Sequence, residues 1–272
     1  MPTPPRLAPI LAAALAITLV GSPPAAAPAG AATATDPLRI AAATMLQRLG
    51  SERSGVGIVP LRSDSRLNAI ADARARDMAA RGYFSHTSPE GIGFSDLLVA
   101  AGITWYGAGE TIAWNTAPDL ELSIDMATEG WMSSTPHRDI LLSGDFNYVG
   151  VGAASAGDRT YWAAVVVKGP DRTPPVASIK RPVVSSTIRD GRRVVTVGWR
   201  ATDPPLAVLT AGIGAYQLQW RRAGGSWQTR SWTSGTSLRL SLRTGRTYEF
   251  RVRARDRAGN VGRWTGVVRA RT

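Results

Sequence analysis

The sequence predicts two domains of different class, a mixed α/β domain followed by an all-β sandwich. Residues 36–170 interleave helical periodicities with few strands, which is typical of a mixed α/β domain. Beyond residue 182, short alternating segments recur with turn signals about every 8–12 residues, which is typical of a sandwich. We therefore expect a first domain over residues 35–169 and a second over residues 176–272.

Residues 1–34 are predicted to be a secretory signal peptide. The apolar run LAPILAAALAITLVG follows Arg6 and precedes small residues, among them the A-x-A site at Ala32-Thr33-Ala34. A short N-terminal membrane anchor is the open alternative. No later segment is apolar for long enough to cross a bilayer, so we expect a secreted protein, released or held at the cell envelope.

The chain contains no cysteine. This excludes a disulfide framework, a thiolate metal site, a cysteine nucleophile and a lipid-modified N-terminal cysteine. Charge is divided unevenly: residues 1–170 hold 12 Lys+Arg and 15 Asp+Glu, whereas residues 171–272 hold 20 and 5. The second part therefore carries a net +15, which favours anionic partners. An arginine-rich composition without any partner is the alternative.

Three helices are expected in the first domain. The first, over residues 36–55, begins with Asp36 as N-cap and Pro37 as its first residue. The second, over residues 64–83, ends at Gly82, so the stretch that follows is a loop. The third spans residues 116–134. Thr116 is the expected N-cap of the third helix, and Pro118 lies in its first turn. Two strands are expected after this helix, over residues 148–155 and 159–169.

The second helix has one apolar face, and its charged residues are expected on the opposite face. Leu67, Ala71, Ala75 and Met78 recur at helical spacing. Asp72, Arg76 and all remaining charged residues of this helix are expected on the solvent side.

A proline-rich linker is expected over residues 170–182, stiff and extended because it holds four prolines. The second domain then shows five strands, over residues 192–203, 215–224, 225–232, 237–242 and 247–256. In the last of these, apolar residues alternate with Arg251, Arg253 and Arg255. We expect these arginines to form an anion-binding stripe on the outer face.

Only two histidines are present, His86 and His137, each after a hydroxyl-rich turn. Together with a carboxylate such as Glu110 they could hold zinc or another divalent cation, since two imidazoles and one carboxylate form a common zinc site. The spacing carries no local signature, so two unrelated surface histidines remain the alternative.

Four segments resemble the bacterial branch of the CAP superfamily, also called SCP-like extracellular domains. They are LNAIADARARDMAARGYFSHTSPEG, GAGETIAW, EGWMSSTPHRDILLSGDFNYVGVGAA and YWAAVVVKG, in order over about residues 38–169. The resemblance implies an α-β-α sandwich with an open cleft that holds two histidines and acidic residues. Some members bind zinc or another divalent ion in this cleft.

Carried over by position, His86 and His137 match the two cleft histidines, and Glu110 matches the acid of the family's Gly-Glu-Asn. The family's second glutamate has no counterpart, because Ser134 stands at that position. Ser134 and Ser85 are candidates for binding a ligand or a metal-bound water. The alternative is that both simply cap turns.

Residues 176–272 resemble a bacterial fibronectin type III domain. The resemblance rests on VTVGWRATD, AYQLQWRRAGGSWQ and TYEFRVRARDRAGNVGRW. It implies a spacer or adhesion module without catalytic residues. Trp227 and Trp232 could stack on sugar rings, although packing on the strand face is the commoner use of tryptophan.

Three functions follow as hypotheses. The favoured one is a secreted binding protein: its cleft takes a small lipid or envelope ligand, and its basic domain attaches to anionic cell-envelope polymers. A metal-dependent hydrolase using His86, His137 and Glu110 is the second, and a structural or adhesion protein is the third. Nucleic acid is disfavoured as a partner because the protein is expected to be exported.

Overall fold

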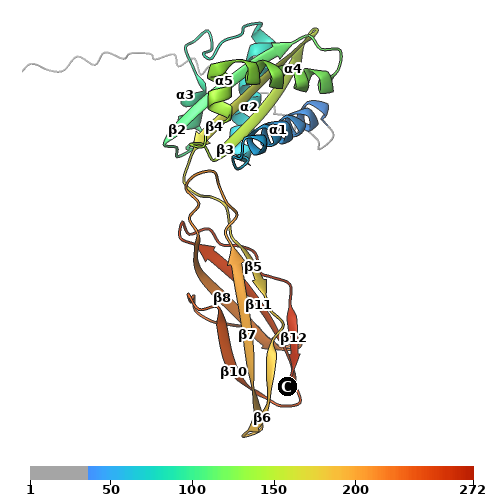
Figure 1. The fold of residues 1–272 in the computed structure, drawn as a ribbon, viewed down its shortest axis with the longest axis vertical. Coiled ribbons are helices and arrows are strands. Elements are labelled where there is room, and N and C mark those ends of the chain that lie inside the picture. The colour runs from blue at the N-terminus through green and yellow to red at the C-terminus, as the bar shows by residue number, and fades with distance from the viewer. Residues whose placement is uncertain (1–35) are drawn as a thin grey trace, which may run out of the picture. The chain divides into compact units, whose positions relative to one another are not determined.

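The computed structural model describes residues 36–272 (Figure 1). The predicted signal peptide, residues 1–34, lies outside the described residues. The first domain contains α1 (Pro37–Gly55), β1 (Arg62–Ser63), α2 (Ser65–Arg81), α3 (Phe94–Ala100), β2 (Gly107–Asn115), α4 (Leu120–Ser133), α5 (Thr135–Leu141), β3 (Tyr148–Ala156) and β4 (Arg159–Lys168).

The first domain is an α-β-α sandwich, as predicted. Its four strands form one sheet in the order β1-β3-β4-β2, and helices cover both faces (Figure 1). Alternate residues of β4 enter two separate cores: Val165 packs with α2 and α3, whereas Val166 packs with α1, α4 and α5. Both faces of the sheet are therefore buried.

Helix caps agree with the sequence in two helices and differ in the third. Asp36 accepts from the Leu38 amide, and Gly82 closes α2 in the left-handed region with φ 68°. Thr116 is not the cap of α4. Strand β2 continues to Asn115, so α4 begins only at Leu120, and the Asp119 carboxylate accepts from the Leu122 amide at 2.8 Å.

The second domain is an all-β sandwich, as predicted. Its strands are β5 (Val176–Ile179), β6 (Val183–Arg189), β7 (Arg192–Thr202), β8 (Ile213–Arg222), β9 (Gln228–Thr229), β10 (Ser237–Arg243), β11 (Thr247–Asp256) and β12 (Val268–Arg271). One sheet has the order β10-β7-β5, with β6 also paired to β7, and the other has the order β12-β11-β8-β9. Strand β5 lies inside the predicted linker 170–182, because its backbone pairs with β7 in antiparallel register despite the flanking prolines.

The closest approach in the first domain is between α2 and β3. A Cβ on Gly150 would lie 2.0 Å from the carbonyl carbon of Leu67, and one on Gly152 would lie 2.1 Å from the Asp72 amide nitrogen. Because these neighbours are backbone atoms of α2, no side-chain movement can relieve the overlap. Glycine at both positions sets the distance between helix and sheet.

We predict that Gly150→Ala destabilises the fold by about 3 kcal/mol or more, since it forces α2 away from β3. Urea unfolding followed by circular dichroism measures this. The matched control is Gly130→Ala in the exposed part of α4, where a Cβ meets nothing within 4 Å. That control should be neutral or stabilising by about 1 kcal/mol. Equal stability of the two variants would contradict the close-approach account.

Candidate functional site

The candidate site is built from α2, the loop that follows it, β2 and α5. Gly82 ends α2 and turns the chain so that the loop carries His86 back towards β2. Glu110 lies on β2 with a fully buried side chain, whereas the side chain of His86 is 53% exposed. His137 lies in the first turn of α5 and is half-buried.

A buried ion pair joins α2 to β2 at the base of the site. The Nε of Arg74 donates to Oε1 of Glu110 at 2.9 Å, and the two side chains are 3% and 0% exposed. The other guanidinium nitrogens donate to the loop: Nη1 to the Tyr83 hydroxyl at 3.1 Å and Nη2 to the Ser85 carbonyl at 2.7 Å. The guanidinium therefore compensates the buried carboxylate and holds the loop in place.

The second oxygen of Glu110 holds His86. Its Oε2 lies 2.8 Å from Nδ1 of His86. Since the carboxylate oxygen accepts hydrogen bonds, Nδ1 carries a hydrogen, and in the neutral imidazole the lone pair is then on Nε2. This is the arrangement in which a carboxylate orients an imidazole towards a ligand.

His137 complements His86. Burial lowers the pKa of His137, and the proximity of His86 lowers it further, because two protonated imidazoles would repel each other. The ring is therefore neutral at pH 7 and can accept a hydrogen bond or bind a cation. The two imidazoles are close enough to influence each other, although they lie on segments 51 residues apart in the sequence.

The contacts of Glu110 suggest a role besides the predicted one. Glu110 is expected as a direct metal ligand beside His86 and His137, and each of its oxygens already accepts one hydrogen bond. It fits the role of a positioning residue for His86. The donor set that remains is two imidazole nitrogens, which fits part of a zinc coordination shell and leaves the other positions to water or ligand.

The two serine candidates behave differently. The Oγ of Ser85 accepts from the Thr87 amide at 3.2 Å, which is a local turn contact. Ser134 occupies the N-cap position of α5, but its hydroxyl makes no capping hydrogen bond. Ser134 thus retains a hydroxyl that can bind a ligand. The hydroxyl of Ser85 instead stabilises the turn, and its carbonyl accepts a hydrogen bond from Arg74.

Arg74 is the site residue that the sequence analysis missed. It was assigned to the charged face of α2, yet it is 2% exposed. A signal was present: Arg74 follows Ala71 by three residues and precedes Met78 by four, so helical spacing places it on the apolar face. An arginine on that face requires a buried acceptor, and Glu110 is that acceptor.

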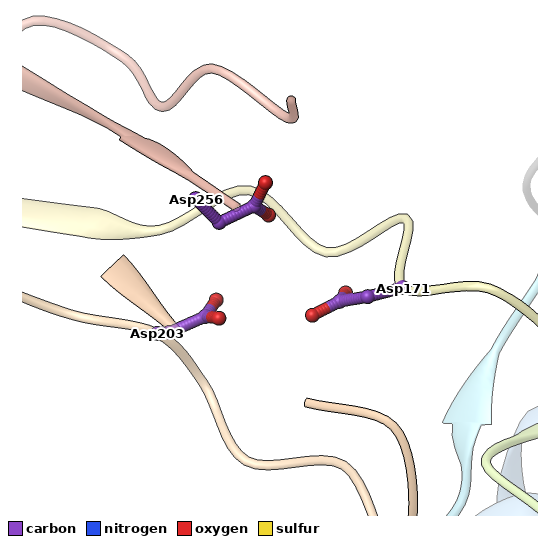
Figure 2. A group of neighbouring side chains, drawn as sticks. All are labelled: Asp171, Asp203 and Asp256. Atoms are coloured by element: carbon purple, nitrogen blue, oxygen red, sulfur yellow. The ribbon is translucent and has the colours of Figure 1, made fainter. Parts of the chain in front are cut away.

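A second group that could hold a cation lies outside the predicted site. Among residues 36–272, Asp171, Asp203 and Asp256 are the one set of three whose ligand atoms lie within 4.8 Å of one another (Figure 2). Oδ1 of Asp203 is buried without a hydrogen-bond partner. Burial raises the pKa of Asp203, as do the charges of the other two aspartates. No pattern in the sequence joins these distant positions.

The predicted arginine stripe is part of a ladder of stacked side chains, which we call the Arg–Trp ladder. Arg251, Arg253 and Arg255 lie along β11, and three tryptophans from distant segments insert between them and Arg221. The distances from guanidinium carbon to ring centroid are 4.3 Å (Arg221–Trp227), 4.3 Å (Arg251–Trp227), 5.0 Å (Arg251–Trp264), 4.5 Å (Arg253–Trp264), 5.4 Å (Arg253–Trp232) and 4.9 Å (Arg255–Trp232).

The three β11 arginines of the ladder keep an uncompensated positive charge although tryptophan rings cover their faces. Arg251 and Arg253 also donate to the side-chain oxygens of Gln219 and Gln217, which are neutral. Among residues 36–272, none of the three β11 arginines forms an ion pair with a carboxylate. Trp227 and Trp232 stack on arginine, so they do not present two free faces to a sugar ring.

Comparison with known proteins follows the same division of the chain. The model of the Cysteine-rich secretory protein family, CAP, matches residues 46–168. The chain is 32% identical over 113 residues to the uncharacterized protein YkwD of Bacillus subtilis (strain 168), covering 42% of this chain and 42% of that protein. It is 32% identical over 112 residues to the uncharacterized membrane protein YlbC of the same strain, covering 41% and 30%. The chain thus spans less than half the length of these curated relatives.

Solved structures are similar to each domain separately. An extracellular protein containing a SCP domain from Bacillus anthracis str. Ames is 25% identical, with a TM-score of 0.42 over 48% of this chain and 41% of that one. The sixth fibronectin type III domain of human fibronectin type III domain containing protein 3 is 27% identical, with a TM-score of 0.27 over 38% and 86%.

We predict that Arg74→Ala costs about 3–5 kcal/mol of unfolding free energy, because it leaves the Glu110 carboxylate buried beside His86 alone. Urea unfolding at pH 7 measures the loss. Arg48→Ala is the matched control, since Arg48 pairs with Asp125 at 2.7 Å with both side chains about half exposed. That exposed pair should contribute about 1 kcal/mol or less. Similar losses in the two variants would show that the buried pair is not the anchor of the site.

Proposed function

Because residues 46–168 form a CAP domain, we propose that this protein is exported and binds a small cell-envelope ligand at His86 and His137. A divalent cation, zinc in the first instance, assists this binding, and the basic sandwich attaches the protein to anionic envelope polymers. One observation carries the proposal: the Arg74–Glu110 pair holds His86 through Nδ1, near a His137 whose pKa is lowered.

The same contacts favour binding over hydrolysis. A metal-dependent hydrolase needs a base, or a further ligand, next to the metal. Glu110 is paired through both oxygens, and Ser134 stands where the family's second glutamate would be. The metal-dependent hydrolase remains the alternative, with His86 and His137 holding the metal and Glu110 as third ligand or general base. A purely structural protein is the other alternative, and it requires neither histidine.

The proposal of export rests on the secretory signal peptide that the sequence predicts over residues 1–34. The Bacillus anthracis protein is described as extracellular, and YlbC is described as a membrane protein. None of the helices within residues 36–272 has the length and apolar character needed to span a membrane.

A lipid is the second ligand class, and it fits a different place from the histidine site. A hollow of about 480 Å³ lies between the start of α1 and the start of α4. Its lining is mainly apolar, with Arg48 and Glu121 as the charged members. The lining residues are Pro37, Ile40, Ala41, Thr44, Arg48, Leu120, Glu121 and Ile124. We assign a small lipid to this hollow, and the histidine site to a polar ligand.

We predict one-to-one zinc binding by the full chain at pH 7, lost in His86→Ala and in His137→Ala. Isothermal titration calorimetry measures it. Glu110→Gln should weaken binding about tenfold or more, because the imidazole loses its orienting carboxylate. The result against the proposal is zinc binding that both histidine variants retain, or its absence in folded wild-type protein.

Two controls accompany the zinc titration. Glu129→Gln removes an exposed acid of α4 and should leave affinity unchanged. Asp203→Asn alters the aspartate group and leaves the histidine site intact, so zinc affinity should again be unchanged. A screen of ester and phosphoester substrates with the zinc-loaded protein decides the alternative: turnover abolished by His137→Ala would establish the hydrolase.

For the hollow between α1 and α4, we predict that Ile40→Glu abolishes binding of a fluorescent fatty acid, because a carboxylate enters the apolar lining. Val56→Glu introduces the same change at a similarly exposed position outside the hollow and should bind normally. Equal binding by the two variants would remove lipid from the proposal.

For the basic domain, we predict retention on an immobilised sulfated polysaccharide, with elution at moderate salt because exposed charges are screened. Arg253→Gln/Arg255→Gln should elute at clearly lower salt than the matched pair Arg222→Gln/Arg230→Gln, which removes equal charge away from the Arg–Trp ladder. Identical elution of the two double variants would show that net charge, and not the ladder, binds the polymer.

A further inference from the structure

A second basic feature lies on the other sheet of the sandwich. Strands β6, β7 and β10 enclose a hollow of about 380 Å³, here called the bulge pocket. Three arginines, three hydroxyl residues and one valine line it, and none of them is acidic: Ser185, Thr187, Arg189, Arg192, Val194, Arg239 and Ser241. The Arg–Trp ladder belongs to the sheet of β8 and β11, so the two features are separate.

An irregularity in strand pairing forms the pocket. Val184 pairs with Val195, and Ile188 pairs with Arg193, so three residues of β6 face the single residue Val194 of β7. The extra residues form a β-bulge, which bends the strand and redirects its side chains. Ser185 and Thr187 lie in this bulge and form one wall of the pocket.

The pocket opens on the solvent face of the sheet. Val195 and Val197 of β7 are fully buried in the sandwich core, so Arg192 and Val194 point outward by alternation. Ser241 is opposite Val194 in the register, which places β10 as the other wall. The Nη1 of Arg192 donates to the Ser241 carbonyl at 2.9 Å, and this contact fixes the guanidinium across the strands.

Like charges are paired directly at one end of the pocket. Arg192 is opposite Arg189 on β6 and opposite Arg243 on β10, which gives a row of three arginines across three strands. Directly opposed like charges destabilise a sheet. Among residues 36–272, no carboxylate lies within ion-pair distance of Arg189, Arg192 or Arg239. An anion in the pocket would relieve this repulsion.

Most of the few acidic residues of this domain interact with groups outside the bulge pocket. Glu249 pairs with Arg221 and Arg269, and three aspartates converge at the other group described above. The remaining one, Asp190, is exposed in the turn between β6 and β7. It is the nearest carboxylate in sequence to the pocket and forms no ion pair there.

We propose that the bulge pocket binds a phosphate group. Planar guanidinium groups match phosphate oxygens with paired hydrogen bonds, and hydroxyl groups supply further donors. In the described part of the chain, the hydroxyls of Thr187 and Ser241 have no hydrogen-bond partner and are free to donate. Together with the Arg–Trp ladder, the pocket gives the sandwich basic sites on both sheets, so one molecule can bind two segments of a polyanion.

The test is calorimetric titration of the full chain with inorganic pyrophosphate at low ionic strength. We expect one site, weakened about tenfold or more in Arg189→Gln/Arg239→Gln, since each lost charge-assisted hydrogen bond is worth roughly that factor. Arg222→Gln/Arg230→Gln loses the same charge outside the pocket and should change affinity less than about twofold. Near-ultraviolet circular dichroism verifies that each variant is folded.

Two further variants separate recognition from net charge. Arg239→Lys keeps the charge but loses the planar guanidinium that can form paired hydrogen bonds with phosphate. Thr187→Val keeps the side-chain shape but loses the hydroxyl. Each variant should weaken pyrophosphate binding several-fold. Pyrophosphate affinity that is the same in the pocket and control pairs, or no binding by the wild type, would overturn the proposal. Neither result depends on the histidine site or on the ladder.

Long-chain polyphosphate identifies the source of the phosphate group. If the pocket variant weakens both pyrophosphate and polyphosphate, the group belongs to a polymer; if it weakens pyrophosphate alone, the pocket takes a free anion. Bridging by wild-type protein, seen as growth in light scattering and lost in both the pocket and ladder variants, would show that both sheets bind one polymer network.

Discussion

The site of the first domain depends on one buried ion pair, that of Arg74 with Glu110. It joins α2 to β2, and the same guanidinium holds the loop at Tyr83 and Ser85. Without Arg74, the Glu110 carboxylate would be buried uncompensated, and a buried charge in that state is costly. With Arg74 in place, Glu110 can use its second oxygen to orient His86.

A steric constraint supports this pair. Glycines of β3 bring the sheet against the backbone of α2 and thereby fix where the helix lies. Residues on the sheet-facing side of α2 then have defined partners on the sheet, and Arg74 is one of them. Close packing therefore positions a polar contact, and the polar contact positions a half-exposed imidazole. The second domain uses a comparable device, since alternation along β11 spaces its arginines and tryptophans fill the intervals.

Local sequence signals predicted the elements whose determinants are adjacent in the chain. The cap of α1 at Asp36 and the stop of α2 at Gly82 are confirmed, and so is the division into a mixed α/β domain and an all-β sandwich. The α-β-α arrangement of the first domain was expected from the family resemblance and is also confirmed. Strand β2 was missed because four consecutive buried residues interrupt its alternation. Because β2 was not predicted, the N-cap of α4 was expected at Thr116 and not at Asp119, where it lies.

Features formed by residues far apart in the chain could not be predicted from local sequence patterns. The partner of Arg74 is 36 residues away, the three aspartates span residues 171–256, and the ladder draws its tryptophans from three separate loops. The pairing of His86 with His137 was expected from the family resemblance and not from spacing. The contacts of Glu110 with Arg74 and His86 needed the structure, because no local pattern joins these three positions.

The most direct test of this account is the tautomer of His86 at neutral pH, read from long-range ¹H–¹⁵N correlation of its ring nitrogens. The account predicts hydrogen on Nδ1 and a free Nε2 in the wild type, with the preference lost in Glu110→Gln. Hydrogen on Nε2 in the wild type, or a tautomer that Glu110→Gln leaves unchanged, would contradict the claim that the Arg74–Glu110 pair prepares His86 for its ligand.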